Sequence, residues 1–116
     1  MIKVTGGTDN EKCICDSVID WCFRNKVIVR RVDLHVRICE YKTFKCHGTC
    51  VNTAWKNLYK ITVAKDQSVR DFVATLIHEL IHVNQYVTGY WEGDGEKECE
   101  DRQYELTDQC WTEGII

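Results

Sequence analysis

Two histidines with a glutamate between them are the residues of this chain best suited to chemistry. Residues 78–82 read His-Glu-Leu-Ile-His. On a helix, positions four apart lie on one face, so His78 and His82 could direct ring nitrogens at one metal ion. Glu79 would lie about 100° round the helix axis, where it could hold a water molecule. The spacing predicts a zinc (Zn2+) site.

A zinc ion in this position would supply hydrolytic chemistry. Bound zinc lowers the pKa of water from about 15.7 to about 7, which makes a nucleophile available at neutral pH. Glu79 could act as the general base, taking the proton of the water and returning it to a leaving amine. We therefore interpret His78 and His82 as metal ligands and Glu79 as the catalytic residue.

A catalytic zinc usually has three protein ligands and one open position. The other two histidines lie upstream on a predicted strand and loop, so we expect the third ligand to be a carboxylate of the next predicted helix. Acidic residues cluster there at Glu96, Glu98, Glu100 and Asp101. Glu98 and Glu100 would point about 200° apart on a helix, so both cannot face the zinc.

The histidines lie within the most strongly predicted helix, residues 69–88. Ser68 can cap its first turn, with Asp71 at the third position as in a capping box. Gly89 is a typical stop. The apolar residues recur at helical spacing and form a stripe that would face the core: Val69, Phe72, Val73, Leu76, Leu80, Val83 and Val87.

The remaining elements are predicted from periodicity. A helix is expected over 11–26, alternating strands over 32–41 and 59–64, a short strand over 46–52 with Gly48 as its weak point, and a polar-rich helix over 96–111. A glycine-rich turn at 91–95 would separate the last two helices. The fold class is α+β, with a small twisted sheet in a single domain spanning 1–116.

Charge and hydropathy exclude several function classes. The net charge is −3 and the pI is near 5.8, so we expect no nucleic-acid partner. No segment has the roughly 18 apolar residues that a membrane span needs, and residues 1–7 have no apolar signal region. We expect a soluble, cytoplasmic protein without a membrane partner.

Eight cysteines leave three interpretations open: disulfides, a second metal site, or buried thiols. Cys99 and Cys110 on one helix would be about 16 Å apart, beyond the reach of a disulfide. A second zinc could be held by four thiols, although neither of their spacings is the usual C-x2-C: Cys13, Cys15, Cys46 and Cys50.

Residues 59–106 resemble the zincin metallopeptidases of the gluzincin type. The resemblance rests on the β-branched strand at 61–63, the HELIH segment and the acids at 98–101. Residues 76–86, 91–93 and 98–100 also resemble small phage-type metallopeptidase-like proteins and, more distantly, the SprT-like and ImmA-like groups. The resemblance implies a minimal zincin-like domain in which an H-E-x-x-H helix lies beside an edge strand.

In gluzincins a glutamate of the following helix is the third zinc ligand, which implies Glu98 here. A small residue usually stands three positions after that glutamate, whereas this chain has Asp101. Glu100 and Glu96 therefore remain alternatives. A tyrosine that stabilises the oxyanion is also implied, and Tyr86, Tyr90 and Tyr104 are available, whereas Asp101 could hold a ligand histidine by its far ring nitrogen.

Residues and resemblance together predict a zinc metallopeptidase that hydrolyses peptide bonds of a peptide or protein substrate. The alternative is a zincin-fold binding or regulatory module in which zinc stabilises the fold and no catalysis occurs. The oligomeric state, the cleavage specificity and a viral or cellular source are left open by the sequence.

Overall fold

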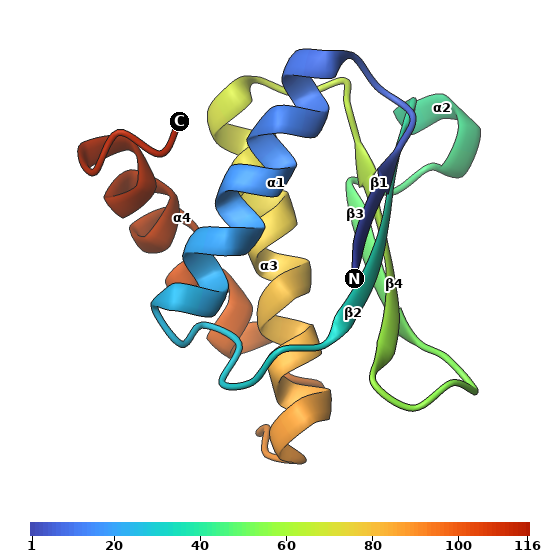
Figure 1. Ribbon diagram of the computed structural model, residues 1–116, viewed down its shortest axis with the longest axis vertical. Coiled ribbons are helices and arrows are strands. Elements are labelled where there is room, and N and C mark those ends of the chain that lie inside the picture. The colour runs from blue at the N-terminus through green and yellow to red at the C-terminus, as the bar shows by residue number, and fades with distance from the viewer.

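The computed structural model describes residues 1–116, apart from the side chain of Phe44. It has eight elements in a mixed α+β order (Figure 1). They are β1 (Ile2–Thr5), α1 (Asp9–Arg24), β2 (Asp33–Cys39), α2 (Tyr41–Phe44), β3 (Gly48–Asn52), β4 (Leu58–Ala64), α3 (Val69–Thr88) and α4 (Glu96–Thr112).

The four strands form one mixed sheet in the order β1-β2-β4-β3. β1, β2 and β4 run parallel, whereas β3 is antiparallel to β4 and forms an edge of the sheet. The parallel pair β1–β2 is connected through α1, as parallel strands require a crossover. β3 also packs against α3, so this edge lies beside the predicted site.

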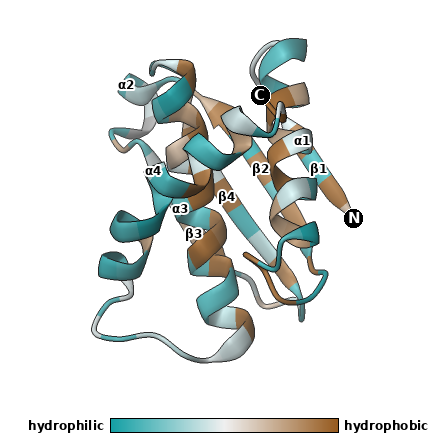
Figure 2. Cartoon of the chain, turned by 90° about the vertical axis from the view of Figure 1, so that its left-hand side faces the viewer, coloured by the Kyte–Doolittle hydropathy of each residue, from teal (hydrophilic) through white to brown (hydrophobic). Residues whose placement is uncertain are grey.

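The core lies between the sheet and the helices. The three long helices all lie on one side of the sheet (Figure 1). Alternate residues of β2 and β4 point to this side and are buried, including Leu34, Val36, Ile61 and Val63. In Figure 2 the strands behind the helices show much brown, whereas α4 is mostly teal, since it contributes only a narrow apolar stripe.

The boundaries of α3 agree with the prediction at both ends. The Ser68 side chain accepts a hydrogen bond from the backbone N–H of Asp71, and Gly89 adopts the left-handed conformation with its N–H bonded to Gln85. The capping box is only half formed, because the Asp71 carboxylate accepts a hydrogen bond from the Tyr104 hydroxyl at 2.7 Å instead. α3 and α4 are therefore linked near the start of α3.

Two elements were not predicted. β1 precedes the first helix and pairs with β2, and the one-turn helix α2 follows β2. The expected order, starting from a helix, was wrong in this respect: four residues at a sheet edge give too short an alternation to detect. The α+β class itself is confirmed. Within the described residues, no helix is both long and apolar enough to cross a membrane.

Candidate metal centre

The two histidines of α3 converge on one carboxylate of α4. Glu96 places Oε2 at 2.9 Å from Nε2 of His78 and Oε1 at 2.8 Å from Nε2 of His82. Both imidazoles are largely buried, with side-chain exposures of 17% and 15%. The predicted i, i+4 geometry is thus realised, and Glu96, at the first position of α4, faces it.

Each histidine is held by a glutamine through its other ring nitrogen. Nδ1 of His78 lies 2.5 Å from Oε1 of Gln103, and Nδ1 of His82 lies 2.8 Å from Oε1 of Gln85. The orientation of the Gln85 amide is determined independently, because its Nε2 donates to the Gly95 carbonyl at 2.9 Å and to Oε1 of Glu98 at 3.0 Å. The Gln85 oxygen must therefore face His82.

This arrangement assigns the protons of His82. An amide oxygen only accepts hydrogen bonds, so Nδ1 of His82 carries a proton and donates it. The Nε2 of the neutral ring is then an acceptor facing a carboxylate oxygen. Two acceptors at 2.8 Å repel each other unless a cation, either a proton or a metal ion, lies between them. The donor set is therefore suited to a positive charge at the point where Nε2 of both histidines and Glu96 meet.

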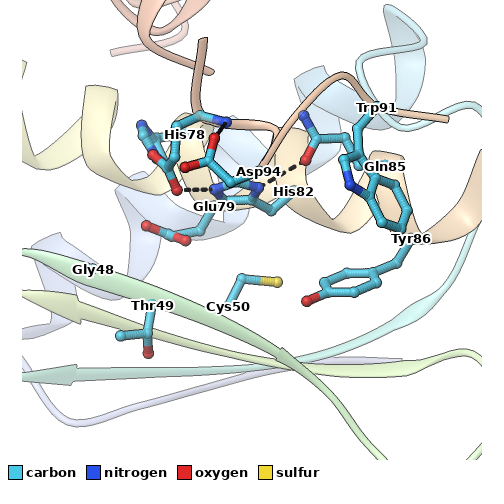
Figure 3. A pocket seen from close by; sticks show the side chains of 11 residues that line it. Gly48, Thr49, Cys50, His78, Glu79, His82, Gln85, Tyr86, Trp91 and Asp94 are labelled. Carbon is cyan, nitrogen blue, oxygen red and sulfur yellow. Dashed lines mark hydrogen bonds and ion pairs between the residues drawn. The ribbon is translucent and has the colours of Figure 1, made fainter. Parts of the chain in front are cut away.

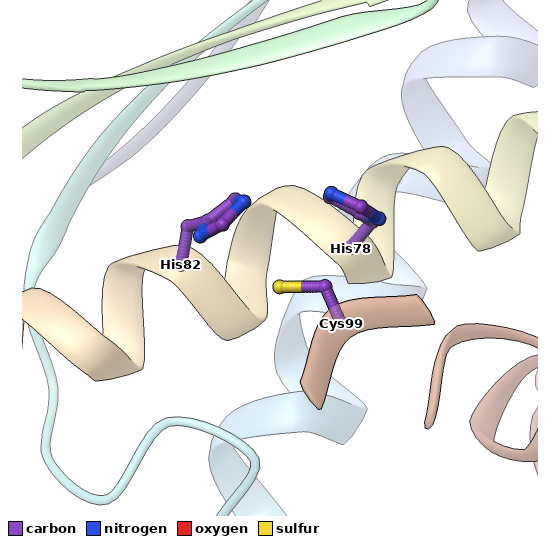
Figure 4. A group of neighbouring side chains, drawn as sticks. All are labelled: His78, His82 and Cys99. Carbon is purple, nitrogen blue, oxygen red and sulfur yellow. The ribbon is translucent and has the colours of Figure 1, made fainter. Parts of the chain in front are cut away.

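A thiol of α4 lies beside the same point. His78, His82 and Cys99 each offer a ligand atom within 4.8 Å of the other two, and they could hold a metal ion (Figure 4). Cys99 is fully buried, and burial, with the nearby carboxylates of Glu96, Glu79 and Glu98, raises the pKa of its thiol to about 12. The thiol is neutral at physiological pH, and metal binding would have to displace its proton.

Glu79 lies on the adjacent side of α3 and lines the cleft that contains both histidines. The cleft has a volume of about 450 Å³ and is bounded on one side by α3 and on the other by β3 (Figure 3). Glu79 is 6% exposed. Burial raises the pKa of its carboxyl group and the Glu96 charge adds to this, whereas both histidines lower it. The Glu79 carboxylate accepts no hydrogen bond from any of the described side chains.

Gly48 explains how β3 comes so close to this carboxylate. A Cβ at position 48 would lie 2.6 Å from Cγ2 of Thr75 and 2.8 Å from Oε2 of Glu79. The glycine that made the strand prediction weakest is therefore the residue that lets the edge strand approach α3.

The structure does not bring Glu98 to the histidines. Its carboxylate accepts hydrogen bonds from Gln85 and from Arg102, the latter at 3.1 Å. Its assignment as third ligand stays a prediction, and the observed contacts favour Glu96. The alternative Glu100 is exposed. Asp101 bonds to Lys97 at 2.8 Å and does not contact a histidine.

The three tyrosines considered for the oxyanion lie in different surroundings. Tyr86 lines the cleft, where it stacks on Tyr59 at 5.9 Å and contacts Trp91 edge-on at 6.2 Å. Tyr104 donates to Asp71, as described above, and Tyr90 is 83% exposed. Tyr86 and Tyr104 therefore both border depressions that contain His78 and Glu79, whereas Tyr90 does not.

The cysteines outside this centre form no second ligand group among the described residues. All eight are free thiols: Cys13 and Cys46 are exposed, Cys39 and Cys50 are partly buried, and Cys15, Cys22, Cys99 and Cys110 are buried. Of the three interpretations of the cysteines, the structure shows buried thiols for half of them.

Comparison with known proteins yields no relative: no family model, no curated protein and no solved structure matches the chain. The site is therefore interpreted from its own geometry. Sequence reasoning missed Gln85 and Gln103, and it considered Cys99 only among the eight cysteines and not as a ligand beside the two histidines. A signal existed for each, since Gln85 follows His82 by three positions, and Cys99 and Gln103 follow Glu96 by three and seven, which are same-face spacings.

Proposed function

We propose that the chain is a zinc-dependent metallopeptidase. The observation that carries this proposal is the convergence of Nε2 of both histidines with Glu96. Beside them lies the buried carboxylate of Glu79, which forms no hydrogen bond with another described side chain. A structural metal site has no need of such a base next to its first ligand. The position of this site beside the edge strand of a sheet favours a peptide as the substrate.

Zinc fits the donor set. Imidazole nitrogen, carboxylate oxygen and thiolate sulfur are all zinc ligands, and two histidines with one carboxylate leave a fourth position open. We place Glu96 ahead of Glu98 in this set, with Cys99 as the competing third ligand. When bound, zinc would supply Lewis-acid activation of water and polarisation of the peptide carbonyl.

The protein side chains would perform the proton transfers. Glu79, whose pKa is raised by burial, would take a proton from water in the cleft and pass it to the departing amine. Gln85 and Gln103 would hold the proton on Nδ1 of each histidine, so that Nε2 faces the metal. Tyr86 borders the cleft and would contact the substrate there.

The substrate would bind in an extended conformation along β3. This strand has a free edge, and two of its residues, Thr49 and Cys50, line the cleft together with Glu79. Backbone hydrogen bonds to an edge strand hold a peptide without requiring a particular sequence. Since the cleft is small and open, we expect flexible or unfolded protein segments to be cleaved.

Replacement of Glu79 by Gln tests the mechanism. The variant keeps the size and polarity of the side chain but cannot accept a proton, so we expect hydrolysis of fluorescein-labelled casein to fall by about 10²- to 10⁴-fold. Bound zinc, measured by mass spectrometry of the native protein, should remain. Glu105→Gln, an exposed change on α4 away from the cleft, is the matched control and should retain full activity.

Two results would contradict the proposal. Undiminished casein hydrolysis by Glu79→Gln would assign the activity to another residue or to a contaminant. Tight zinc binding that raises thermal stability without hydrolysis of any unfolded substrate would favour the non-catalytic, zinc-stabilised binding module.

A further inference from the structure

The side of the sheet opposite the long helices carries a cluster of cationic and hydroxyl side chains. The strand register places Lys3 beside His35 and His35 beside Lys60 in one row across β1, β2 and β4. The next row on this side holds Thr5, Arg37 and Thr62. We call these six residues the basic face; they line a shallow depression of about 330 Å³.

The positive charge of the basic face is not compensated. Among the described residues, Lys3, Arg37 and Lys60 form no ion pair and no side-chain hydrogen bond. The four strands contain one acidic residue, Asp33, and it pairs with the N-terminal amine. This local excess occurs in a chain whose net charge is −3, so it does not reflect a basic protein as a whole.

An unsatisfied imidazole lies at the centre of the same row. Nε2 of His35 is buried and has no hydrogen-bond partner among the described atoms. The imidazole lies between two lysines on neighbouring strands, and it is these two ammonium groups that favour an anion over a cation at this place.

The chemistry of the basic face favours phosphate over a protein surface. Its side chains are hydrogen-bond donors, and lysine, arginine and threonine are the side chains that contact phosphate oxygens in nucleic-acid complexes. Protein–protein interfaces instead have an apolar or aromatic centre that is depleted in lysine. The basic face has no Phe, Tyr or Trp, and the one exposed apolar neighbour in the register is Val51, beside Lys60.

We propose that the basic face binds the phosphates of a single-stranded polynucleotide. Lys3 and Lys60 are separated by two strand spacings, about 9.6 Å, which exceeds the width of one phosphate and suits neighbouring phosphates of a strand. The cationic side chains all lie on strands of the sheet, and none is on a helix or two-stranded ribbon of the kind that enters the major groove of a duplex, so we place a single strand here. Without Phe, Tyr or Trp the bases do not stack, so binding is independent of base sequence.

This proposal departs from the sequence-based expectation of no nucleic-acid partner, because that expectation rested on the net charge of the whole chain. It is also independent of the proposed hydrolysis, because the metal centre lies on the opposite side of the sheet. A strand bound on the basic face would leave the cleft and β3 open to a peptide.

Fluorescence anisotropy with a labelled oligothymidylate of about 20 nucleotides tests the proposal. Three phosphate contacts predict that log Kobs falls with log salt at a slope of about −2 between about 20 and 200 mM salt. Lys60→Gln should reduce the slope to about −1.4, and Lys60→Glu should weaken binding about tenfold at the lower salt. An oligoadenylate of the same length should bind equally.

Lys26→Glu is the matched control, because Lys26 is exposed, forms no ion pair among the described residues and lies beyond the end of α1. It changes the net charge as Lys60→Glu does and should leave binding unchanged; both variants should show wild-type circular dichroism. Equal losses in the two variants, the absence of binding at low salt, or equal competition by a polyglutamate peptide of matched charge would each overturn the proposal.

Discussion

The candidate metal ligands of α4 differ in how far they lie from the side of the helix that faces α3. The buried residues Cys99, Leu106, Thr107 and Cys110 form one stripe along α4. At 100° per residue, Glu96 lies within about 40° of the centre of this stripe, whereas Glu98 lies about 120° away. Glu96 can therefore reach both histidines directly, and Glu98 reaches His82 only through the amide of Gln85.

Paired alanine variants test this difference at the residue scale. If Glu96 is the third ligand, as proposed, Glu96→Ala should lower zinc affinity by more than about 100-fold, whereas Glu98→Ala, which removes only a contact to Gln85, should lower it about tenfold. Affinity is measured by competition with a chelating dye. A larger loss in Glu98→Ala would instead support the ligand that the family resemblance implies. Cobalt substitution would show thiolate-to-cobalt absorption only if Cys99 is a ligand.

At the scale of elements, the turn between α3 and α4 holds the site together. Gly95 adopts the left-handed conformation, and a Cβ there would lie 2.3 Å from Oε1 of Gln85. The Gly95 carbonyl accepts a hydrogen bond from the same amide. The backbone of the turn therefore touches the residue that orients His82, so the geometry of the turn is coupled to the metal centre.

Gly95→Ala should weaken metal binding because the new methyl group displaces the Gln85 amide. We expect a loss of zinc affinity of about 10- to 100-fold, as for the removal of other contacts that orient a ligand. Gly93→Ala is the control: Gly93 also has a positive φ, but a Cβ there would meet nothing within 4 Å. Isothermal titration of both variants separates the two effects, and an equal loss in Gly93→Ala would show that backbone strain alone is responsible.

At the scale of the whole molecule, the helices on one side of the sheet bury several thiols in the core. Burial is the main cause that raises the pKa of Cys15 and Cys50 to about 12 and that of Cys110 to about 11. It raises the pKa of Cys22 as well. The folded state thus keeps these protons at a pH where the unfolded chain, with thiol pKa values near 9, releases them.

This difference predicts alkaline destabilisation. Above pH 9 the unfolded state binds fewer protons than the folded state, so stability falls as pH rises, by up to about 1.4 kcal/mol per pH unit for each buried thiol. The loss should continue until the folded thiols ionise, near pH 11 for Cys110. Guanidinium unfolding at pH 8, 9 and 10 measures it. Cys110→Ala should give a shallower dependence, and a slope identical to wild type would contradict this origin.

Local patterns in the sequence were sufficient for much of the fold and part of the site. The apolar stripe, Ser68 and Gly89 predicted both ends of α3, because helix periodicity and capping depend on neighbouring residues. The same locality predicted that His78 and His82 share a face. β1 was missed because four residues form a strand only when β2 is beside them.

What only the tertiary structure decided was how separate elements meet. It brought Glu96 and Cys99 of α4 to the histidines of α3, directed Glu98 to Gln85, and placed Gly48 of β3 against Glu79. It also gathered three cations from three strands on one side of the sheet. Spacing along a chain determines directions within one element, whereas the distances between elements depend on packing of the whole core, which no local pattern contains.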